Sequence, residues 1–188
     1  RPYFLFVGRL EYIKGVQNLI KAFRKKPEYD LLVAGDGVYR EALESQAEGC
    51  PNIKFLGRQD QASLSELYRL ATAVIVPSIC YETFGIVIIE AFSHKTPAIV
   101  NDLGALPEVI EDSGGGFVYK TEDQLVEALQ KLVSAPELRT ELGENGYRAF
   151  LKKWCEDPHI EMYLDLIYTI EEDRDRTSGT RKARGHAA

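Results

Sequence analysis

Short apolar runs alternate with amphipathic stretches along most of this sequence, and this alternation limits the possible fold more than any other feature. Each run is apolar at successive positions, which is typical of strands covered on both faces of a parallel sheet. The predicted strands are Tyr3–Val7, Leu31–Ala34, Ile53–Leu56, Ala73–Val76, Ala98–Val100 and Phe117–Tyr119. The stretches between and after them carry apolar residues at helical spacing. The predicted helices are 14–25, 38–48, 63–71, 85–93, 106–111, 123–133, 137–154 and 159–172. The pattern predicts an α/β fold with a doubly wound, Rossmann-like parallel sheet.

The length of 188 residues fits one domain, which we expect to cover residues 1–172. Residues 173–188 lack large apolar side chains and are rich in arginine, glycine, serine and threonine. Such a composition cannot build a core, so we expect a disordered tail.

The composition excludes several classes of protein. A formal net charge of −6 argues against a nucleic-acid-binding protein, which needs a cationic face. Cys50, Cys80 and Cys155 form no close pair and the histidines are scattered, so neither a disulfide framework nor a metal site is predicted. No apolar run approaches the roughly 20 residues that span a bilayer. We therefore expect free thiols and a cytoplasmic location.

Polar residues follow the ends of the predicted strands. Arg9 and Lys14 follow the first strand, and Arg58 follows the third. The segment 77–85 follows the fourth strand, and 101–107 follows the fifth. Because ligands of open parallel sheets bind beyond the carboxyl ends of the strands, we expect the chemistry to gather along this edge.

The common nucleotide-binding fingerprints are not met. The turn that begins at Gly35 carries Arg40 where a dinucleotide fingerprint needs its third glycine, and a bulky side chain there impedes close packing of helix on strand. The sequence also lacks a phosphate-binding P-loop.

The segment from Pro77 to Ala91 runs from a strand end through a polar turn into an apolar helix. Backbone N–H groups from Thr83 to Ile86 are expected to open this helix, and such a terminus attracts phosphate. Gly85 lets the backbone approach a ligand closely. Glu90 interrupts the apolar helix and needs a partner, either the hydroxyls of a ligand, a structural ion pair or solvent.

Six motifs occur in the order found in one known family. They are Gly8-Arg9-Leu10-x-x-x-Lys14-Gly15, Leu32-Val33-Ala34-Gly35-Asp36-Gly37, Val76-Pro77-Ser78, Glu82-x7-Glu90-Ala91, Pro97, and Gly104-x-x-Pro107-Glu108. Together they resemble the C-terminal, nucleotide-sugar-binding domain of the GT-B-fold retaining glycosyltransferases of family 4, also called group 1. The resemblance covers about residues 3 to 172. It implies that the chain is one half of a GT-B fold, without its N-terminal acceptor domain.

The resemblance also implies roles for the matched positions. Arg9 and Lys14 match the basic pair that holds the donor diphosphate and acts in catalysis. Glu82 matches the catalytic glutamate near the anomeric carbon, and Glu90 matches the glutamate that holds the ribose hydroxyls. The other donor-binding positions are Gly8, Gly57, Arg58, Thr83, Phe84, Gly85 and Ile86. The segment 154–168 is similar to the one that crosses back to the N-terminal domain.

The implied activity is hexosyl transfer from a UDP-, GDP- or ADP-sugar with retention, without metal or other cofactor. The alternatives are a noncatalytic nucleotide-binding module, a GT-B-fold sugar epimerase, and a phosphorylase, for which no pyridoxal phosphate motif is found. The resemblance leaves open the base, the sugar, the acceptor and any membrane association of the parent protein. This sequence departs from the family at Lys95, where a small residue or glycine is usual and a positive φ is expected, and at Ala105.

Overall fold

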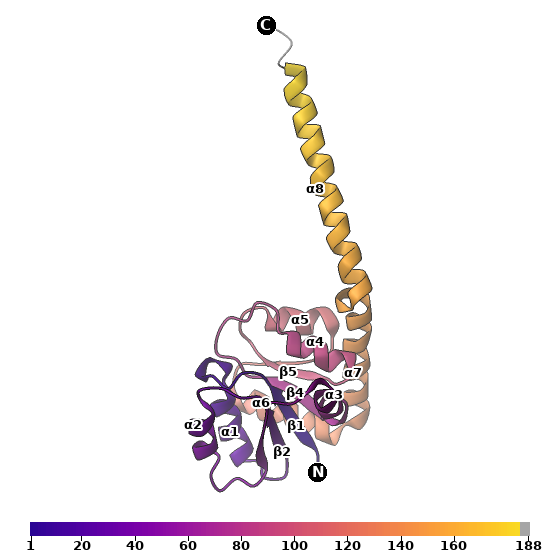
Figure 1. The fold of residues 1–188 in the computed structure, drawn as a ribbon. Helices are drawn as coiled ribbons and strands as arrows, with labels where there is room; N and C mark the ends of the chain where they lie inside the picture. Colours follow the sequence, from indigo (N-terminus) through magenta and orange to yellow (C-terminus); the bar gives the residue numbers. More distant parts are fainter. Residues whose placement is uncertain (185–188) are drawn as a thin grey trace. The chain divides into compact units, whose positions relative to one another are not determined.

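A computed structural model describes residues 1–184 and confirms the parallel sheet. Every neighbouring pair of strands is parallel, and the strand order is β3-β2-β1-β4-β5-β6 (Figure 1). The strands are β1 (Tyr3–Val7), β2 (Asp30–Ala34), β3 (Ile53–Gly57), β4 (Ala73–Val76), β5 (Ala98–Asn101) and β6 (Gly116–Tyr119). Each predicted strand is present. The inner strands β1, β4 and β5 are largely buried, whereas the edge strands β3 and β6 are mostly only partly buried.

Helices cover both faces of the sheet. They are α1 (Val16–Arg24), α2 (Arg40–Gln46), α3 (Gln61–Leu70), α4 (Ile86–Ser93), α5 (Leu106–Ser113), α6 (Glu122–Ser134) and α7 (Pro136–Ala149). A further helix, α8 (Glu156–Arg184), follows them in the chain. A short 3-10 helix, η1 (Tyr12–Lys14), precedes α1, and a π-helical segment, η2 (Phe150–Trp154), follows α7. Helices α1, α2 and α6 share one apolar core with the sheet, whereas α4 and α5 pack on its other face.

The side chains of β1 show how one strand serves both layers. Phe4 and Phe6 are buried in the core under α1 and α6. Leu5, which lies between them, is fully buried but does not belong to that cluster. Since successive side chains of a strand point to opposite faces, an unbroken apolar run is what a two-sided core requires.

The strand order creates a crevice beside β1. The chain moves outward from β1 to β2 and β3, and then returns to place β4 on the other side of β1. At such a switch point the loops after neighbouring strands diverge and leave room for a ligand. The loops after β1 and β4 are those that carry Arg9 and the segment 77–85.

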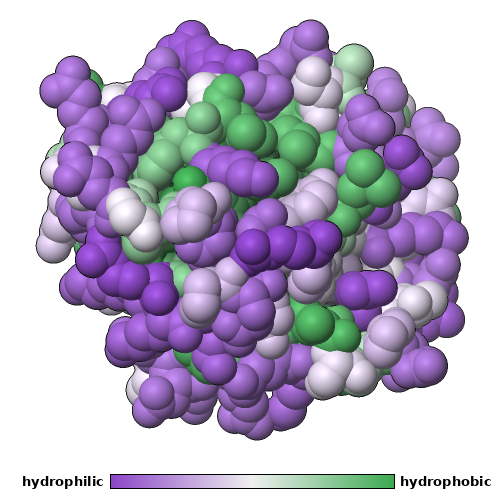
Figure 2. All heavy atoms as spheres, turned by 90° about the horizontal axis from the view of Figure 1, so that it is seen from below, coloured by the Kyte–Doolittle hydropathy of each residue, from purple (hydrophilic) through white to green (hydrophobic). Residues whose placement is uncertain are grey.

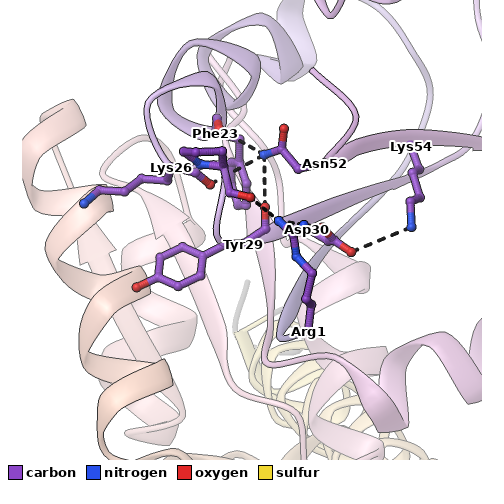
Figure 3. A network of polar contacts seen from close by, with 8 residues as sticks. Arg1, Phe23, Lys26, Tyr29, Asp30, Asn52 and Lys54 are labelled. Carbon is purple, nitrogen blue, oxygen red and sulfur yellow. Dashed lines mark hydrogen bonds and ion pairs between the residues drawn. The ribbon is translucent and has the colours of Figure 1, made fainter. Parts of the chain in front are cut away.

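A buried asparagine connects α1 with the turn before β2, at the amino end of the strands (Figure 3). Asn52 is 3% exposed, and its side-chain amide donates to the carbonyl oxygens of Phe23 and Tyr29, at 3.0 Å each. Asp30 nearby pairs with Arg1 and Lys54. The asparagine thus ties the end of α1, through Phe23, to the turn before β2, through Tyr29.

Lys95 adopts the positive φ that the sequence comparison with the family predicts. Its φ is 58°, a region that costs a residue with a Cβ roughly 1–2 kcal/mol. Its ammonium bonds Glu144 of α7 at 2.7 Å and lies 4.9 Å from the ring centre of Tyr147. These contacts with α7 offset part of the strain, so a lysine is tolerated where the family has a small residue.

The chain divides into two compact units, Arg1–Phe150 and a second one that begins at Leu151. The expectation of one domain over residues 1–172, followed by a disordered tail from residue 173, stays a prediction. In the structure α8 continues from Glu156 to Arg184, so the described residues 173–184 are helical. The rest of the predicted tail, 185–188, lies outside the described residues.

The surface of the molecule is largely hydrophilic in the view of Figure 2, with separate apolar areas between charged side chains. Among the described residues, no helix combines the length and the apolar character needed to cross a bilayer.

Candidate functional site

Two neighbouring cavities lie at the carboxyl edge of the sheet, beyond β1. The first has a volume of about 330 Å³ and lies between the loop after β1 and the start of α4. The second, also of about 330 Å³, lies toward β2 and β3 and is lined by Asp36, Arg58 and Leu64. Both are lined by Val7, Gly8 and Arg9. We call the first the α4 cavity and the second the β3 cavity.

Most of the predicted site residues line these cavities. Those in the α4 cavity are Gly8, Arg9, Lys14, Glu82, Thr83, Phe84, Gly85 and Ile86. Arg58 lines the β3 cavity, whereas Gly57 and Glu90 line neither. The strand ends and the start of α4 thus bring together residues that are far apart in the sequence.

Glu82 is the centre of the polar contacts in the α4 cavity. Its Oε1 accepts a hydrogen bond from Lys14 Nζ at 2.6 Å and another from Ser78 Oγ at 2.6 Å. The side chains of Lys14 and Glu82 are 21% and 19% exposed, so the ion pair is largely shielded from water. A shielded pair is screened less than a surface pair and keeps a defined geometry.

The surroundings keep Glu82 ionised. Burial alone raises the pKa of the Glu82 carboxyl, but the hydrogen bonds from Lys14 and Ser78 and the charges of Lys14 and Arg9 outweigh burial and hold the pKa below its usual value. A negative charge is therefore fixed in the cavity at neutral pH.

A close backbone approach brings Lys14 to Glu82. Gly15 has a φ of 75°, and a Cβ at this position would lie 1.9 Å from the carbonyl oxygen of Pro77. Only glycine permits this contact, which places η1 directly against the loop after β4. The motif that contains Gly15 gives no sign of this role, because the contact joins segments that are distant along the chain.

Arg9 is held differently from Lys14. Its side chain is 73% exposed and forms an ion pair of 2.8 Å with Glu11. Arg9 lines both cavities. An exposed pair of this kind contributes little to stability, so Arg9 can exchange its partner at small cost.

Helix α4 begins later than the sequence indicates. Gly85 is its N-cap, with φ 84°, and Ile86 is its first residue. Thr83 and Phe84 therefore lie in the preceding loop rather than at the helix terminus. The N–H groups of Ile86 and Val87 form the first turn, at the wall of the α4 cavity.

The side chain of Glu90 has a hydrogen-bond partner within the protein. The Tyr68 hydroxyl donates to Glu90 Oε2 at 2.6 Å, and Tyr68 is only 2% exposed. Burial, together with the neighbouring carboxylate, raises the pKa of Tyr68, so the phenol stays protonated and remains a donor. The Tyr68 ring also stacks on His94. The sequence left open ligand hydroxyls, an ion pair or solvent as partners of Glu90. The structure gives Glu90 a different partner, the hydroxyl of Tyr68, which the helical pattern did not predict.

A third cavity, of about 410 Å³, lies at the opposite edge of the sheet, beside Pro2, Thr72 and Arg139. It contains none of the predicted site residues. Among the residues described, no group of three histidine, cysteine or acidic side chains is placed to hold a metal ion.

Residues 1–149 match the family described as glycosyl transferases group 1. An uncharacterized glycosyltransferase of Methanocaldococcus jannaschii is 35% identical over 161 residues, which are 81% of this chain and 41% of that protein. The chain spans less than half the length of the curated relatives it matches.

Two solved structures show the same fold. The C-terminal domain of a glycosyl transferase group 1 family protein from Francisella tularensis is 28% identical, with a TM-score of 0.69, over 81% of this chain and 86% of that one. The Anabaena protein HepE in complex with UDP-glucose is 20% identical, with a TM-score of 0.79, over 90% of this chain and 48% of that one. The family match and these likenesses agree with the resemblance read from the motifs, and the chain belongs to the group 1 glycosyltransferases.

Proposed function

We propose that this chain binds a nucleoside diphosphate sugar in the two neighbouring cavities, and that its parent enzyme transfers the hexosyl group with retention of the anomeric configuration. One observation carries the proposal: Lys14, Arg9 and the first turn of α4 surround one cavity that also holds the ionised Glu82. A diphosphate needs cations and N–H groups, and a sugar that departs from it needs a nearby anion.

The α4 cavity suits the diphosphate and the sugar. Lys14 has three donors, of which Glu82 occupies one, so the ammonium can also bind a phosphate oxygen. Arg9 can add a second cation when it leaves Glu11. Both cations stabilise the diphosphate as its bond to the sugar breaks, while the Glu82 carboxylate stabilises positive charge at the anomeric carbon.

The β3 cavity suits the base. It shares Gly8 and Arg9 with the α4 cavity and is lined by Arg58 and the apolar Leu64. Bound UDP-glucose in the HepE structure supports a nucleotide sugar as ligand. The role of Glu90 at the ribose, a cytoplasmic location and independence from metal remain predictions.

The acceptor site belongs in our proposal to an N-terminal domain. The relatives are more than twice as long as their match to this chain, which supports a second domain. We therefore expect the chain alone to bind donor but to transfer poorly.

A binding panel tests the proposal. We expect one of UDP, GDP or ADP to raise the melting temperature of the chain, and the matching nucleotide sugar to bind more tightly than the nucleotide. At about 100-fold over its dissociation constant, a ligand adds roughly 2.7 kcal/mol of stability. The variant Lys14→Met should weaken the binding by at least 10-fold, whereas Lys131→Met, which removes an exposed lysine of α6, should not.

The outcomes separate the alternatives. Binding of a nucleotide without any gain from the sugar would favour the noncatalytic module. Conversion of the nucleotide sugar into its epimer by the parent protein, without an acceptor, would favour the epimerase. If none of the nucleotides or their sugars binds, the proposal is wrong.

A further inference from the structure

Ser78 is buried beside the α4 cavity and has no part in the function proposed above. It follows β4 after Pro77 and is 1% exposed. Its hydroxyl donates to Glu82 Oε1 at 2.6 Å. A buried hydroxyl that donates to a carboxylate makes a charge-assisted bond, which is stronger than a bond between neutral groups.

Both donors to Glu82 converge on the same oxygen. Lys14 Nζ and Ser78 Oγ each lie 2.6 Å from Oε1. The structure gives no hydrogen bond to Oε2 from the described part of the chain. Two donors on one oxygen fix the rotation of the carboxylate, and the second oxygen remains for a ligand in the cavity that Glu82 lines.

Ser78 is the steadier of the two donors. Lys14 has a flexible side chain that is 21% exposed, and its proposed ligand is the donor diphosphate. The peptide group between Ser78 and Ile79 is held at both of its polar atoms: the Asn101 side-chain amide donates to the Ser78 carbonyl oxygen at 2.9 Å, and the N–H of Ile79 donates to the Ile13 carbonyl oxygen at 2.9 Å. The serine therefore keeps its place when Lys14 changes partners.

The backbone of Glu82 is also held, from the loop after β5. The N–H of Ala105 donates to the Glu82 carbonyl oxygen at 3.3 Å. Gly104 has a φ of 66°, and a Cβ there would lie 3.0 Å from the Glu82 nitrogen. The backbone of Glu82 is thus held by this loop. When Lys14 turns to the diphosphate, the bond from Ser78 is the one that keeps the direction of the carboxylate.

We propose that Ser78 is a positioning residue: it holds Glu82 through Oε1 so that Oε2 faces the sugar of the bound donor. This inference rests on the proposed function. It predicts that loss of the Ser78 hydroxyl weakens the binding of the sugar and leaves the binding of the nucleotide unchanged.

The test compares matched nucleotides and nucleotide sugars by isothermal titration calorimetry. The probes are UDP with UDP-glucose, GDP with GDP-mannose, and ADP with ADP-glucose, and the pair that binds the wild-type chain best is used for the variants. The readout is the dissociation constant of the nucleotide divided by that of the nucleotide sugar. We call this ratio the sugar gain. A merely structural role of Ser78 would change both constants together and leave this ratio unaltered.

We expect Ser78→Ala to reduce the sugar gain by about 10-fold. If the wild-type gain is below about 10, the gain of the variant should fall to a ratio of about one. The dissociation constant of the nucleotide should stay unchanged. Ser78→Cys keeps the size but donates weakly, so its gain should be intermediate. Glu82→Gln should also lose the gain. The control Ser113→Ala removes a hydroxyl that bonds the backbone at the end of α5, and should behave as wild type.

Several outcomes overturn the inference. If Glu82→Gln loses the gain but Ser78→Ala and Ser78→Cys keep it, Ser78 does not position Glu82 and the proposed function stands. If Ser78→Ala weakens nucleotide and nucleotide sugar equally, its role is structural. If Ser78→Ala does not fold, Ser78→Cys with a wild-type gain overturns the inference alone. If the wild-type chain shows no sugar gain with any pair, both the proposed role of Glu82 and this inference are wrong.

Discussion

Replacement of Gly85 by alanine tests whether the start of α4 is part of the donor site. Gly85 has a φ of 84°, which costs a residue with a Cβ about 1–2 kcal/mol. The added Cβ would lie 2.8 Å from Leu106 Cδ2 and 3.0 Å from Ile88 Cδ1. Both atoms are ends of flexible side chains that can move at small cost, so backbone strain dominates. We expect a loss of about 1–2 kcal/mol in the free energy of unfolding.

Gly49 provides a control for this strain. Its φ is 77°, and no atom lies within 4 Å of a Cβ added there. Gly49→Ala therefore pays a similar strain of about 1–2 kcal/mol at a position that lines neither cavity. Urea unfolding should show comparable losses of stability for the two variants.

The two variants should differ in binding. Gly85→Ala shifts the N–H groups of Ile86 and Val87 that we assign to the diphosphate, so calorimetry should show at least 10-fold weaker binding of the preferred nucleotide. Gly49→Ala should bind as wild type. Equal affinity of Gly85→Ala and Gly49→Ala would refute a contribution of the α4 terminus.

Three further predictions concern stability. Gly143→Ala should destabilise the chain by about 1–3 kcal/mol in urea unfolding, because a Cβ would lie 2.1 Å from the backbone oxygen of Lys95 and this overlap outweighs the roughly 1 kcal/mol of helix propensity gained; the control Thr140→Ala, exposed on the same helix, should change stability little, and a stabilised Gly143→Ala would contradict the packing. Lys95→Gly should be more stable than Lys95→Ala by about 1 kcal/mol in the same assay, since only glycine relieves the positive φ; the reverse order would show that the strain is negligible. The pKa of Glu82 is lowered in the folded chain, so its stabilising effect is present above the ordinary carboxyl pKa of 4.5 and is lost as the pH falls through the lower folded value. The stability of Glu82→Gln should therefore fall less than that of wild type when melting temperatures are followed from pH 7 to pH 3, and parallel curves would contradict the shift.

The sequence predicts the sheet well because each strand leaves a local signal. A parallel strand covered on both faces must be apolar at successive positions, and β1 and β4 are short runs of this kind. The motifs after the strands point to the same edge of the sheet at which the structure has the α4 and β3 cavities.

The features of the site that the sequence does not predict depend on contacts between segments that are distant along the chain. Lys14 and Glu82 are both predicted from motifs, but the bond between them depends on Gly15 against Pro77. Likewise, the helical pattern shows that Glu90 needs a partner without pointing to Tyr68. Local patterns carry no information about such pairs, because nothing in them gives the distance between two loops.

Composition alone does not determine the backbone of the C-terminal segment. Low apolar content indicates that residues 173–188 build no core, but it does not distinguish an isolated helix from an irregular chain. Helix α8 continues to Arg184 in the described part of this segment.

A crystal structure of the chain with the nucleotide sugar that it binds best tests the central claim most directly. We predict that the diphosphate lies in the α4 cavity within hydrogen-bond distance of Lys14 and the N–H groups at the start of α4, with the base beside Arg58 and the sugar beside Glu82. A diphosphate bound elsewhere, such as in the cavity beside Arg139 at the opposite edge of the sheet, would contradict this account.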